Sequence, residues 1–182
     1  TKTAGTIKLE AKDVRGDVTA LTALYDTNKA SFIALGNENV TITGANPTAA
    51  QLNKIAAATT GKVTATLAPA TDIEAATVAL LKDVKATDAI TFVTDDTDLV
   101  GKDDLNALLA IKKLIPNANF SAINVINADA KDVALVKNVL KDVAANVAVT
   151  ITGTGDISAA DANAIAKGTL GALTATIKDG SV

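Results

Sequence analysis

The chain contains no cysteine, methionine, histidine or tryptophan. Without cysteine it has no disulfide bonds, thiol nucleophiles or thiolate metal sites, and without histidine it has no imidazole base or ligand. The Ser–His and Cys–His forms of nucleophilic catalysis are therefore excluded. A Ser–Lys pair remains formally open, but no catalytic motif surrounds any serine. These absences predict that the protein is not an enzyme and has no catalytic residues.

Aromatic residues are also scarce, at 2% of the chain, with one tyrosine and three phenylalanines. Hydrophobic residues still make up 48% of the sequence, and almost all of these are alanine, valine, isoleucine and leucine. A core without large rings must be built from many small and regular contacts. This composition favours a layered or repetitive structure over an irregular globule.

Positive charge is in slight deficit, because 17 lysine and arginine residues stand against 20 aspartate and glutamate residues. A chain with this acidic balance and few aromatic rings lacks the basic surface and the stacking platforms that nucleic acids require. We therefore expect no nucleic-acid partner. No apolar run reaches the roughly 18 residues of a membrane-spanning helix, so we also expect no membrane span.

What the chain does contain is an internal repeat. Residues 40–67 read VTITGANPTAAQLNKIAAATTGKVTATL, and residues 149–177 read VTITGTGDISAADANAIAKGTLGALTATI. The two segments align with a single one-residue gap in the loop. Weaker copies are found at residues 6–26, 70–84, 97–115 and 127–145. The segments 70–84, 97–115 and 127–145 each follow an apolar strand, so each unit reads as a short strand, a turn and an amphipathic helix.

The strand anchors recur at spacings typical of repeat architectures. They are Val40, Val63, Ile90, Ile123, Val149 and Thr174. We therefore interpret residues 1–182 as a single repeat domain. Its units are residues 1–30, 31–61, 62–88, 89–119, 120–146 and 147–172, with a partial unit at 173–182. Because the partial unit opens a further strand, we expect an unfinished stack, either a segment of a longer array or a chain that polymerises.

Capping patterns mark the starts of three predicted helices. A hydroxyl precedes an amide or a carboxylate by three residues in the pairs Thr48 with Gln51, Thr71 with Glu74, and Ser158 with Asp161. Apolar residues then recur every three or four positions, which predicts one buried stripe on a helix. The stripes are Ile73, Ala76, Leu80 and Val84; Leu105, Leu108 and Leu109; and Val133, Val136, Val139, Leu140 and Val143. Pro116 predicts the end of the helix in residues 97–115.

The predicted strands alternate apolar residues with threonine. Strand–helix–strand units imply parallel pairing, and a polar strand face implies helices on one side of the sheet only. The sequence therefore predicts an α/β fold, a leucine-rich-repeat-like solenoid with a one-sided parallel sheet. Residues 31–44 read either as a hairpin turning at residues 36–39 or as two strands of a modified cap repeat.

The acidic stretch TDDTDLVGKDD at residues 94–104 allows two interpretations. The first is a solvated turn whose acids favour the start of the following helix, with no cofactor. The alternative is a weak calcium site, since carboxylate oxygens are the ligands that calcium prefers. Its candidate ligands are Asp95, Asp96, Asp98, Asp103 and Asp104. The stretch fails as an EF-hand, because Val100 and Ala107 fall where oxygen ligands are needed.

The threonine rows are a candidate binding face. They comprise Thr41, Thr43, Thr64, Thr66, Thr91, Thr150, Thr152, Thr174 and Thr176. Neighbouring parallel strands lie about 4.8 Å apart, so the rows form a hydroxyl and methyl grid for a glycan, a protein or ice. The simpler interpretation is that threonine suits exposed strands and pairs well with itself.

Gly153 and Gly155 read as a turn before a capped helix, because the further glycines of a phosphate loop are missing.

The quoted repeat, TITG followed by TAAQLNKIAAATTGKVTATL, resembles the Ala/Thr/Val/Asp-rich repeats of very large secreted bacterial surface proteins of the S-layer, haemolysin-type or adhesin-like kind. The resemblance implies secretion, a cell-surface or extracellular location, and assembly into a layer, a filament or an adhesive stalk. It implies self-association or contact with neighbouring repeats, with a surface glycan as a further partner. The alternative function is a ligand-binding module that uses the threonine face, stabilised by calcium if the acidic stretch binds it.

Overall fold

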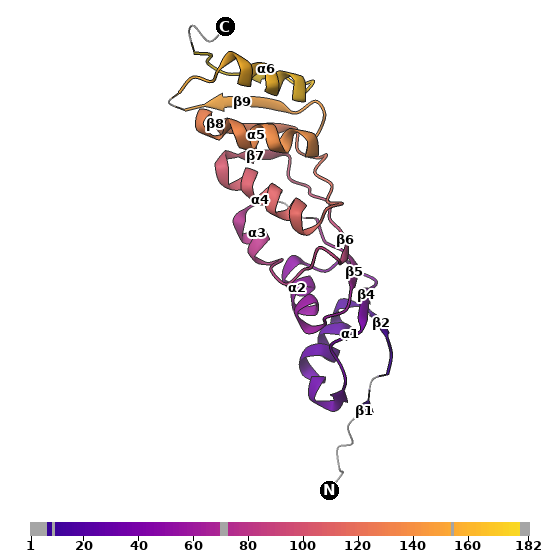
Figure 1. The fold of residues 1–182 in the computed structure, drawn as a ribbon. Coiled ribbons are helices and arrows are strands. Elements are labelled where there is room, and N and C mark those ends of the chain that lie inside the picture. The colour runs from indigo at the N-terminus through magenta and orange to yellow at the C-terminus, as the bar shows by residue number, and fades with distance from the viewer. Residues whose placement is uncertain (1–6, 9, 70–72, 154, 179–182) are drawn as a thin grey trace. The chain divides into compact units, whose positions relative to one another are not determined.

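The computed structural model describes residues 7–8, 10–69, 73–153 and 155–178, which form an α/β structure with parallel sheets (Figure 1). The chain divides into two compact units. The N-terminal unit holds residues 1–68, 79–92 and 113–118, and the C-terminal unit holds residues 69–78, 93–112 and 119–182. The prediction of a single repeat domain, with the repeat boundaries given above, stays a prediction.

The N-terminal unit is built on a parallel sheet whose strands follow one another in the order β2-β4-β5-β6. These strands are Asp13–Gly16, Asn39–Ile42, Val63–Thr66 and Ala89–Thr91. A separate parallel pair joins β1 (Ile7–Lys8) to β3 (Phe32–Ile33). The helical segments are α1 (Val18–Thr22), the π-helical turn Ala23–Thr27, the 3₁₀ turn Lys29–Ser31 and α2 (Ala49–Ala58). Figure 1 shows α1 and α2 on the same side of the four-stranded sheet.

The C-terminal unit repeats this arrangement with strands in the order β7-β8-β9-β10, all parallel. These strands are Asp98–Val100, Val125–Asp129, Ala148–Thr152 and Leu173–Thr174. The helical segments are α5 (Val133–Val139), flanked by the 3₁₀ turns Ala130–Asp132 and Leu140–Asp142, and α6 (Ala159–Gly168). Two further helices are α3 (Ala75–Ala79) and α4 (Gly101–Leu114).

Two of the predicted helix caps are confirmed. The Thr48 hydroxyl accepts from the Gln51 amide at 3.3 Å, and the Gln51 side chain accepts from the Thr48 amide at 2.9 Å, so α2 begins with a complete capping box. The Ser158 hydroxyl accepts from the Asp161 amide at 3.0 Å at the start of α6. Each cap satisfies an amide that has no partner inside the helix. The third predicted cap, Thr71, lies outside the described residues.

Most of the predicted core is confirmed. Leu105 and Leu108 of α4 and Val133 and Val136 of α5 are buried, and α4 ends two residues before Pro116. The stripe predicted for residues 73–84 is wrong in its centre. Leu80 is 46% exposed while Leu81 is fully buried. The reason is that the α-helix ends at Ala79, so the residues after it no longer follow the three- and four-residue spacing of a helix.

Three details of the predicted strands are wrong. Of the two interpretations of residues 31–44, the hairpin is wrong: the segment holds two separate strands, because β3 pairs with β1 while β4 pairs with β2 and β5. Ile123 does not anchor a strand; it is buried in the turn before β8. The sequence predicts a solvated turn at residues 94–104, but Asp98–Val100 within it form β7, which pairs in register with β8. For residues 31–44 and for β7, pairing with a distant strand decides the conformation.

Candidate functional site

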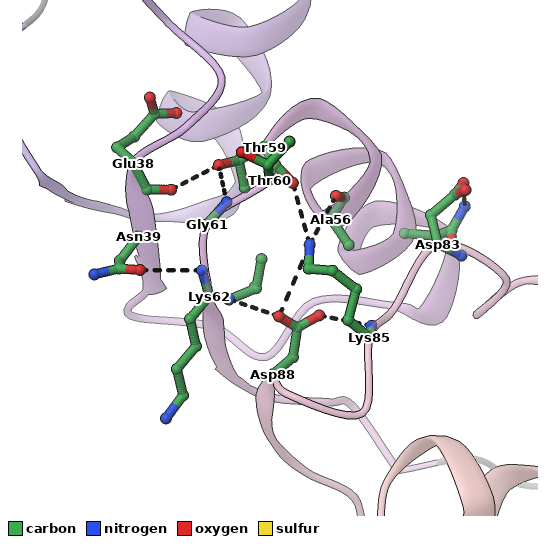
Figure 2. A network of polar contacts seen from close by, with 12 residues as sticks. Glu38, Asn39, Ala56, Thr59, Thr60, Gly61, Lys62, Asp83, Lys85 and Asp88 are labelled. Atoms are coloured by element: carbon green, nitrogen blue, oxygen red, sulfur yellow. Dashed lines mark hydrogen bonds and ion pairs between the residues drawn. The ribbon is translucent and has the colours of Figure 1, made fainter.

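The most distinctive contact of the N-terminal repeat copy lies between the end of α2 and the start of β5. The buried Thr59 hydroxyl donates to the Glu38 carbonyl oxygen at 2.6 Å and accepts from the Gly61 amide at 3.0 Å (Figure 2). A Cβ atom on Gly61 would lie 2.2 Å from the same carbonyl oxygen. The backbone of Gly61 can approach this closely only because it carries no side chain. Thr59 and Gly61 together fasten one repeat copy to the loop that precedes it.

The C-terminal copy makes the same contact with equivalent residues. The Thr169 hydroxyl donates to the Val147 carbonyl oxygen at 2.5 Å and accepts from the Gly171 amide at 2.9 Å. A Cβ atom on Gly171 would lie 2.2 Å from the Val147 carbonyl oxygen. The Thr-x-Gly spacing that the two aligned segments share is the signal in the sequence that identifies the contact.

A lysine joins α2 to the segment that follows β5. The Lys85 ammonium donates to the carbonyl oxygens of Thr59 at 3.1 Å and of Ala56 at 3.5 Å, and it lies 3.9 Å from the Asp88 carboxylate (Figure 2). The carbonyl groups at a helix C-terminus lack partners within the helix and carry partial negative charge. Lys85 therefore satisfies the end of α2 with a cation supplied by the segment between α3 and β6.

Asp88 fixes the start of β5 from the neighbouring strand. Its side chain is fully buried, and its carboxylate accepts from the amides of Val63 and Lys85, each at 2.9 Å. Asn39 has the corresponding role on the other side of β5, because its side-chain oxygen accepts from the Lys62 amide at 3.0 Å. In both cases a side chain, and not the backbone of a neighbouring strand, accepts the backbone amide at the start of β5 and so fixes the register of that strand.

A reciprocal pair of hydrogen bonds completes this network. The Asn53 side-chain amide donates to the Asp83 carboxylate at 2.9 Å, and the Asp83 backbone amide donates to the Asn53 side-chain oxygen at 2.7 Å. Asn53 belongs to α2, so the pair ties this helix to the same segment that carries Lys85 and Asp88. The network holds successive strand–helix units together, and it contains no nucleophile paired with a base.

The N-terminal unit also contains a buried tyrosine–glutamate pair. The Tyr25 hydroxyl donates to the Glu38 carboxylate, which also accepts from the amides of Gly36 at 2.8 Å and Asn37 at 3.1 Å. Burial alone would raise the pKa of Glu38, but these hydrogen bonds outweigh it and hold the pKa below its ordinary value. Burial, and next the hydrogen bond with Glu38, raises the pKa of Tyr25. Glu38 is thus a buried anion with three donors.

A small cavity lies beside this pair. It has a volume of about 220 Å³ and is lined by Thr22, Tyr25, Asp26, Lys54, Ile55 and Ala58. Pockets for drug-sized ligands are typically about 300–1,000 Å³ and have convergent polar groups. The cavity is smaller than this range, and the Tyr25 hydroxyl on its wall is already bonded to Glu38.

The candidate calcium ligands fall into separate roles. Asp96 is buried, and its carboxylate accepts from the amides of Ile73 at 2.9 Å and Asp98 at 3.2 Å. Asp98 opens β7, Asp103 and Asp104 lie in the first turn of α4, and Asp95 is exposed. Within the described ranges, no group of three or more acidic side chains is arranged to hold a metal ion. The acids of α4 lie where the solvated-turn interpretation expects them.

The candidate threonine face is divided between the two units. Thr41, Thr43, Thr64, Thr66 and Thr91 belong to the N-terminal unit, and Thr150, Thr152, Thr174 and Thr176 belong to the C-terminal unit. Three pairs stand opposite each other on neighbouring strands: Thr41 with Thr64, Thr66 with Thr91, and Thr150 with Thr174. The structure therefore brings the threonines into two short rows. It does not test whether either row binds a ligand.

Comparison of the chain with protein-family models, with curated proteins and with solved structures gives no match. In the part of the chain that the structure describes, no helix combines the length and the apolar character that crossing a membrane requires.

Proposed function

We propose that this chain is a non-enzymatic structural protein of the bacterial cell surface or extracellular matrix, which assembles into a layer, a filament or an adhesive stalk. Its architecture in this proposal is a leucine-rich-repeat-like solenoid with a one-sided parallel sheet. The observation that carries the proposal is the shared contact of Thr59 with Glu38 and of Thr169 with Val147. Strand–helix segments that are joined by the same bonds can lengthen a stack of such segments without forming a reaction centre.

The proposed location rests on composition and resemblance. The chain has no cysteine, methionine or histidine and is slightly acidic. Its alanine- and threonine-rich repeats resemble those of large secreted surface proteins. In such proteins the natural partners are further repeats, of the same chain or of another molecule, together with surface glycans.

The alternative proposal is a ligand-binding repeat module for a glycan, a protein or ice. It is favoured by the threonines that stand opposite each other on neighbouring strands, such as Thr41 with Thr64. Under this alternative the exposed hydroxyl and methyl groups of each row contact the ligand, and calcium bound at residues 94–104 stabilises the chain. Structural assembly ranks first, because exposed threonine pairs also stabilise a sheet that binds nothing.

Electron microscopy of the purified chain separates the two proposals. Assembly predicts fibres or lattices that form as the protein concentration rises. A chain that stays monomeric and binds a glycan array or ice crystals through its threonine rows would overturn the assembly proposal in favour of the binding module. The matched variant replaces Thr64 and Thr66 by lysine, which should weaken ligand binding through the N-terminal row but leave assembly through other surfaces intact.

A further inference from the structure

The two repeat copies differ in how far the same side chains are covered. After the N-terminal copy, the inward-facing residues of β5 and its extension are almost fully buried: Val63 at 0%, Ala65 at 4% and Leu67 at 2% exposure. The equivalent residues after the C-terminal copy are Leu173, Ala175 and Ile177. Leu173 and Ala175 are only half-buried, and Ile177 is 51% exposed. Identical positions of one repeat are therefore covered in one copy and open in the other.

The covering helices show the same difference. Ala56 of α2 is 3% exposed, whereas the equivalent Ala166 of α6 is exposed. Asn53 of α2 is half-buried and pairs with Asp83. The equivalent residue of α6 is also an asparagine, Asn163, but its side chain is exposed. The residue types needed for the contact are thus present in the second copy.

The segment that covers the N-terminal copy is known in detail. Residues 79–92 place β6 in parallel beside β5, with Leu81, Ile90 and Phe92 buried. Three polar residues of the same segment make the bonds described above: Asp83 to Asn53, Lys85 to the carbonyl groups ending α2, and Asp88 to the Val63 amide. The segment therefore carries the pattern Asp-x-Lys-x-x-Asp-x-Ile-x-Phe from residue 83 to residue 92.

We infer that the C-terminal face, formed by α6 and the outer edge of β10, docks a polypeptide segment with the chemistry of residues 79–92, which is a turn followed by a strand. The residues of this face are Asn163, Ala166, Thr169, Leu173, Ala175 and Ile177. Within the described residues β10 pairs only with β9, so its other edge offers backbone groups for a parallel strand. The inference deepens the proposed assembly function, on which it rests, by naming the surface and the chemistry of the segment that docks there. Residues 79–92 themselves already pack on β5 and α2, so the occupant is a second segment of the same chemistry.

The equivalence of the two copies specifies each contact of the docked segment. An aspartate in the position of Asp83 pairs with the Asn163 side chain. A lysine in the position of Lys85 donates to the carbonyl oxygens of Ala166 and Thr169. An aspartate in the position of Asp88 accepts from the Leu173 amide, and the isoleucine and phenylalanine cover Ala175 and Ile177. A glycan or a lipid could not supply the strand edge that this arrangement requires.

The test uses the full chain labelled with ¹⁵N and a synthetic peptide of residues 79–92, ALLKDVKATDAITF. We expect saturable amide shift changes confined to Asn163, Ala166, Leu173, Ala175 and Ile177 and their neighbours. A control peptide with D83A, K85A and D88A should cause markedly smaller shifts, as should the original peptide added to the I177D chain. Shifts elsewhere, or shifts that the control peptide reproduces, would overturn the inference.

Because a short peptide loses conformational entropy on docking, a second variant removes that cost. In it a copy of residues 68–92 follows Ile177 directly, as residue 68 follows Leu67 in the N-terminal copy. Hydrogen exchange at the Leu173 and Ile177 amides should slow by about tenfold or more relative to the unextended chain. Unchanged exchange in this variant would contradict the inference even if the peptide gave weak shifts.

These outcomes are separable from the assembly proposal. If the chain forms fibres or lattices while the extension leaves the two amides unprotected, assembly uses another surface and the docking inference fails. If the peptide and the extension protect the face while the chain alone remains monomeric at all concentrations, the docking inference holds and self-assembly fails.

Discussion

The buried hydroxyl of Thr59 donates to the backbone carbonyl of Glu38 across 21 residues of sequence, at a distance of 2.6 Å. Glu38 is itself buried, and its side chain accepts from Tyr25 and two backbone amides. One short loop therefore receives a bond on its backbone from the end of α2 and a bond on its side chain from the preceding helical turn, which holds Tyr25. Within the N-terminal unit, successive strand–helix segments are joined by side-chain hydroxyls, carboxylates and amides as well as by apolar packing.

Replacing Thr59 by valine keeps the shape of the side chain and removes its hydroxyl. The Glu38 carbonyl and the Gly61 amide then lose a partner in a buried site, so we expect unfolding to become easier by about 1–3 kcal/mol. T169V should cost a similar amount for the same reason. Urea unfolding monitored by circular dichroism measures both effects.

The matched control is T64V, since Thr64 is exposed on β5. Its effect should stay within about 0.5 kcal/mol. An equal loss of stability in T64V and T59V would show that valine itself, and not the missing hydrogen bond, causes the destabilisation.

G61A and G171A place a methyl group 2.2 Å from a carbonyl oxygen, so the loop must move away. We expect a destabilisation of about 1–3 kcal/mol, with loss of the neighbouring threonine contact. G16A is the control, because the nearest atom to its added Cβ would lie at an ordinary 3.4 Å. Thermal unfolding should separate the variants by several degrees, and a normal melting temperature for G61A would refute the close approach.

K85M removes the cation from the end of α2 and leaves the buried Asp88 carboxylate without its lysine partner. A hydrogen bond from a charged group typically contributes about 1.5–3 kcal/mol, and Lys85 is partly exposed, so we expect a loss near the lower value. K82M changes a largely exposed lysine and should have little effect. Parallel urea titrations compare the two, and equal stabilities would rule out a role for Lys85 in joining the units.

Tyr25 and Glu38 predict a pH dependence of stability. Because the pKa of Glu38 is lowered on folding, its contribution is present above its ordinary value of 4.5 and is lost as the pH falls through the folded-state value. Y25F removes one of the hydrogen bonds that outweigh burial, so the pKa of Glu38 should rise. We expect Y25F to lose about 1.5–3 kcal/mol at pH 7 and clearly less at pH 3.

Unfolding of wild type and Y25F by urea at both pH values measures this difference. E38Q provides the control, because its side chain cannot ionise and its stability should vary less with acid than that of the wild type. A Y25F deficit that is the same at pH 7 and pH 3 would show that the tyrosine contributes only packing.

Asp96 is expected to stabilise the chain without any metal. D96A removes the acceptor for the amides of Ile73 and Asp98, so it should lower stability by about 1–3 kcal/mol whether or not calcium is present. D95A, at an exposed position, should be nearly neutral. Thermal scans with and without millimolar calcium test this, and a melting temperature that calcium raises in wild type but not in D96A would establish the calcium alternative instead.

The parts of the fold that follow from local chemistry could be predicted from the sequence. The alternation of Val40 and Ile42 with threonine predicts β4, and the spacing of Thr48 and Gln51 predicts the start of α2; both are confirmed. Strand β7 could not be predicted in this way, because Leu99 alone is buried in it and acidic residues surround it. Its conformation comes from pairing with β8, more than twenty residues later.

The candidate site was harder to predict than the fold. Thr59 looks like an ordinary polar residue at a helix end, and nothing in its immediate sequence indicates that it is buried. Lys85 and Asp88 likewise resemble a solvated turn until β6 places them beside α2 and β5. Comparing the two strong copies position by position would have singled out Thr59 with Thr169, because both precede a glycine by two residues.

Sedimentation velocity over a wide concentration range tests the central proposal of assembly most directly. We predict that the sedimentation coefficient of the wild-type chain rises with concentration as units stack, and that I177D, which places a charge on the C-terminal face, reduces this rise. A single monomeric species for the wild type at every concentration would contradict the proposal that this chain builds a layer, a filament or a stalk.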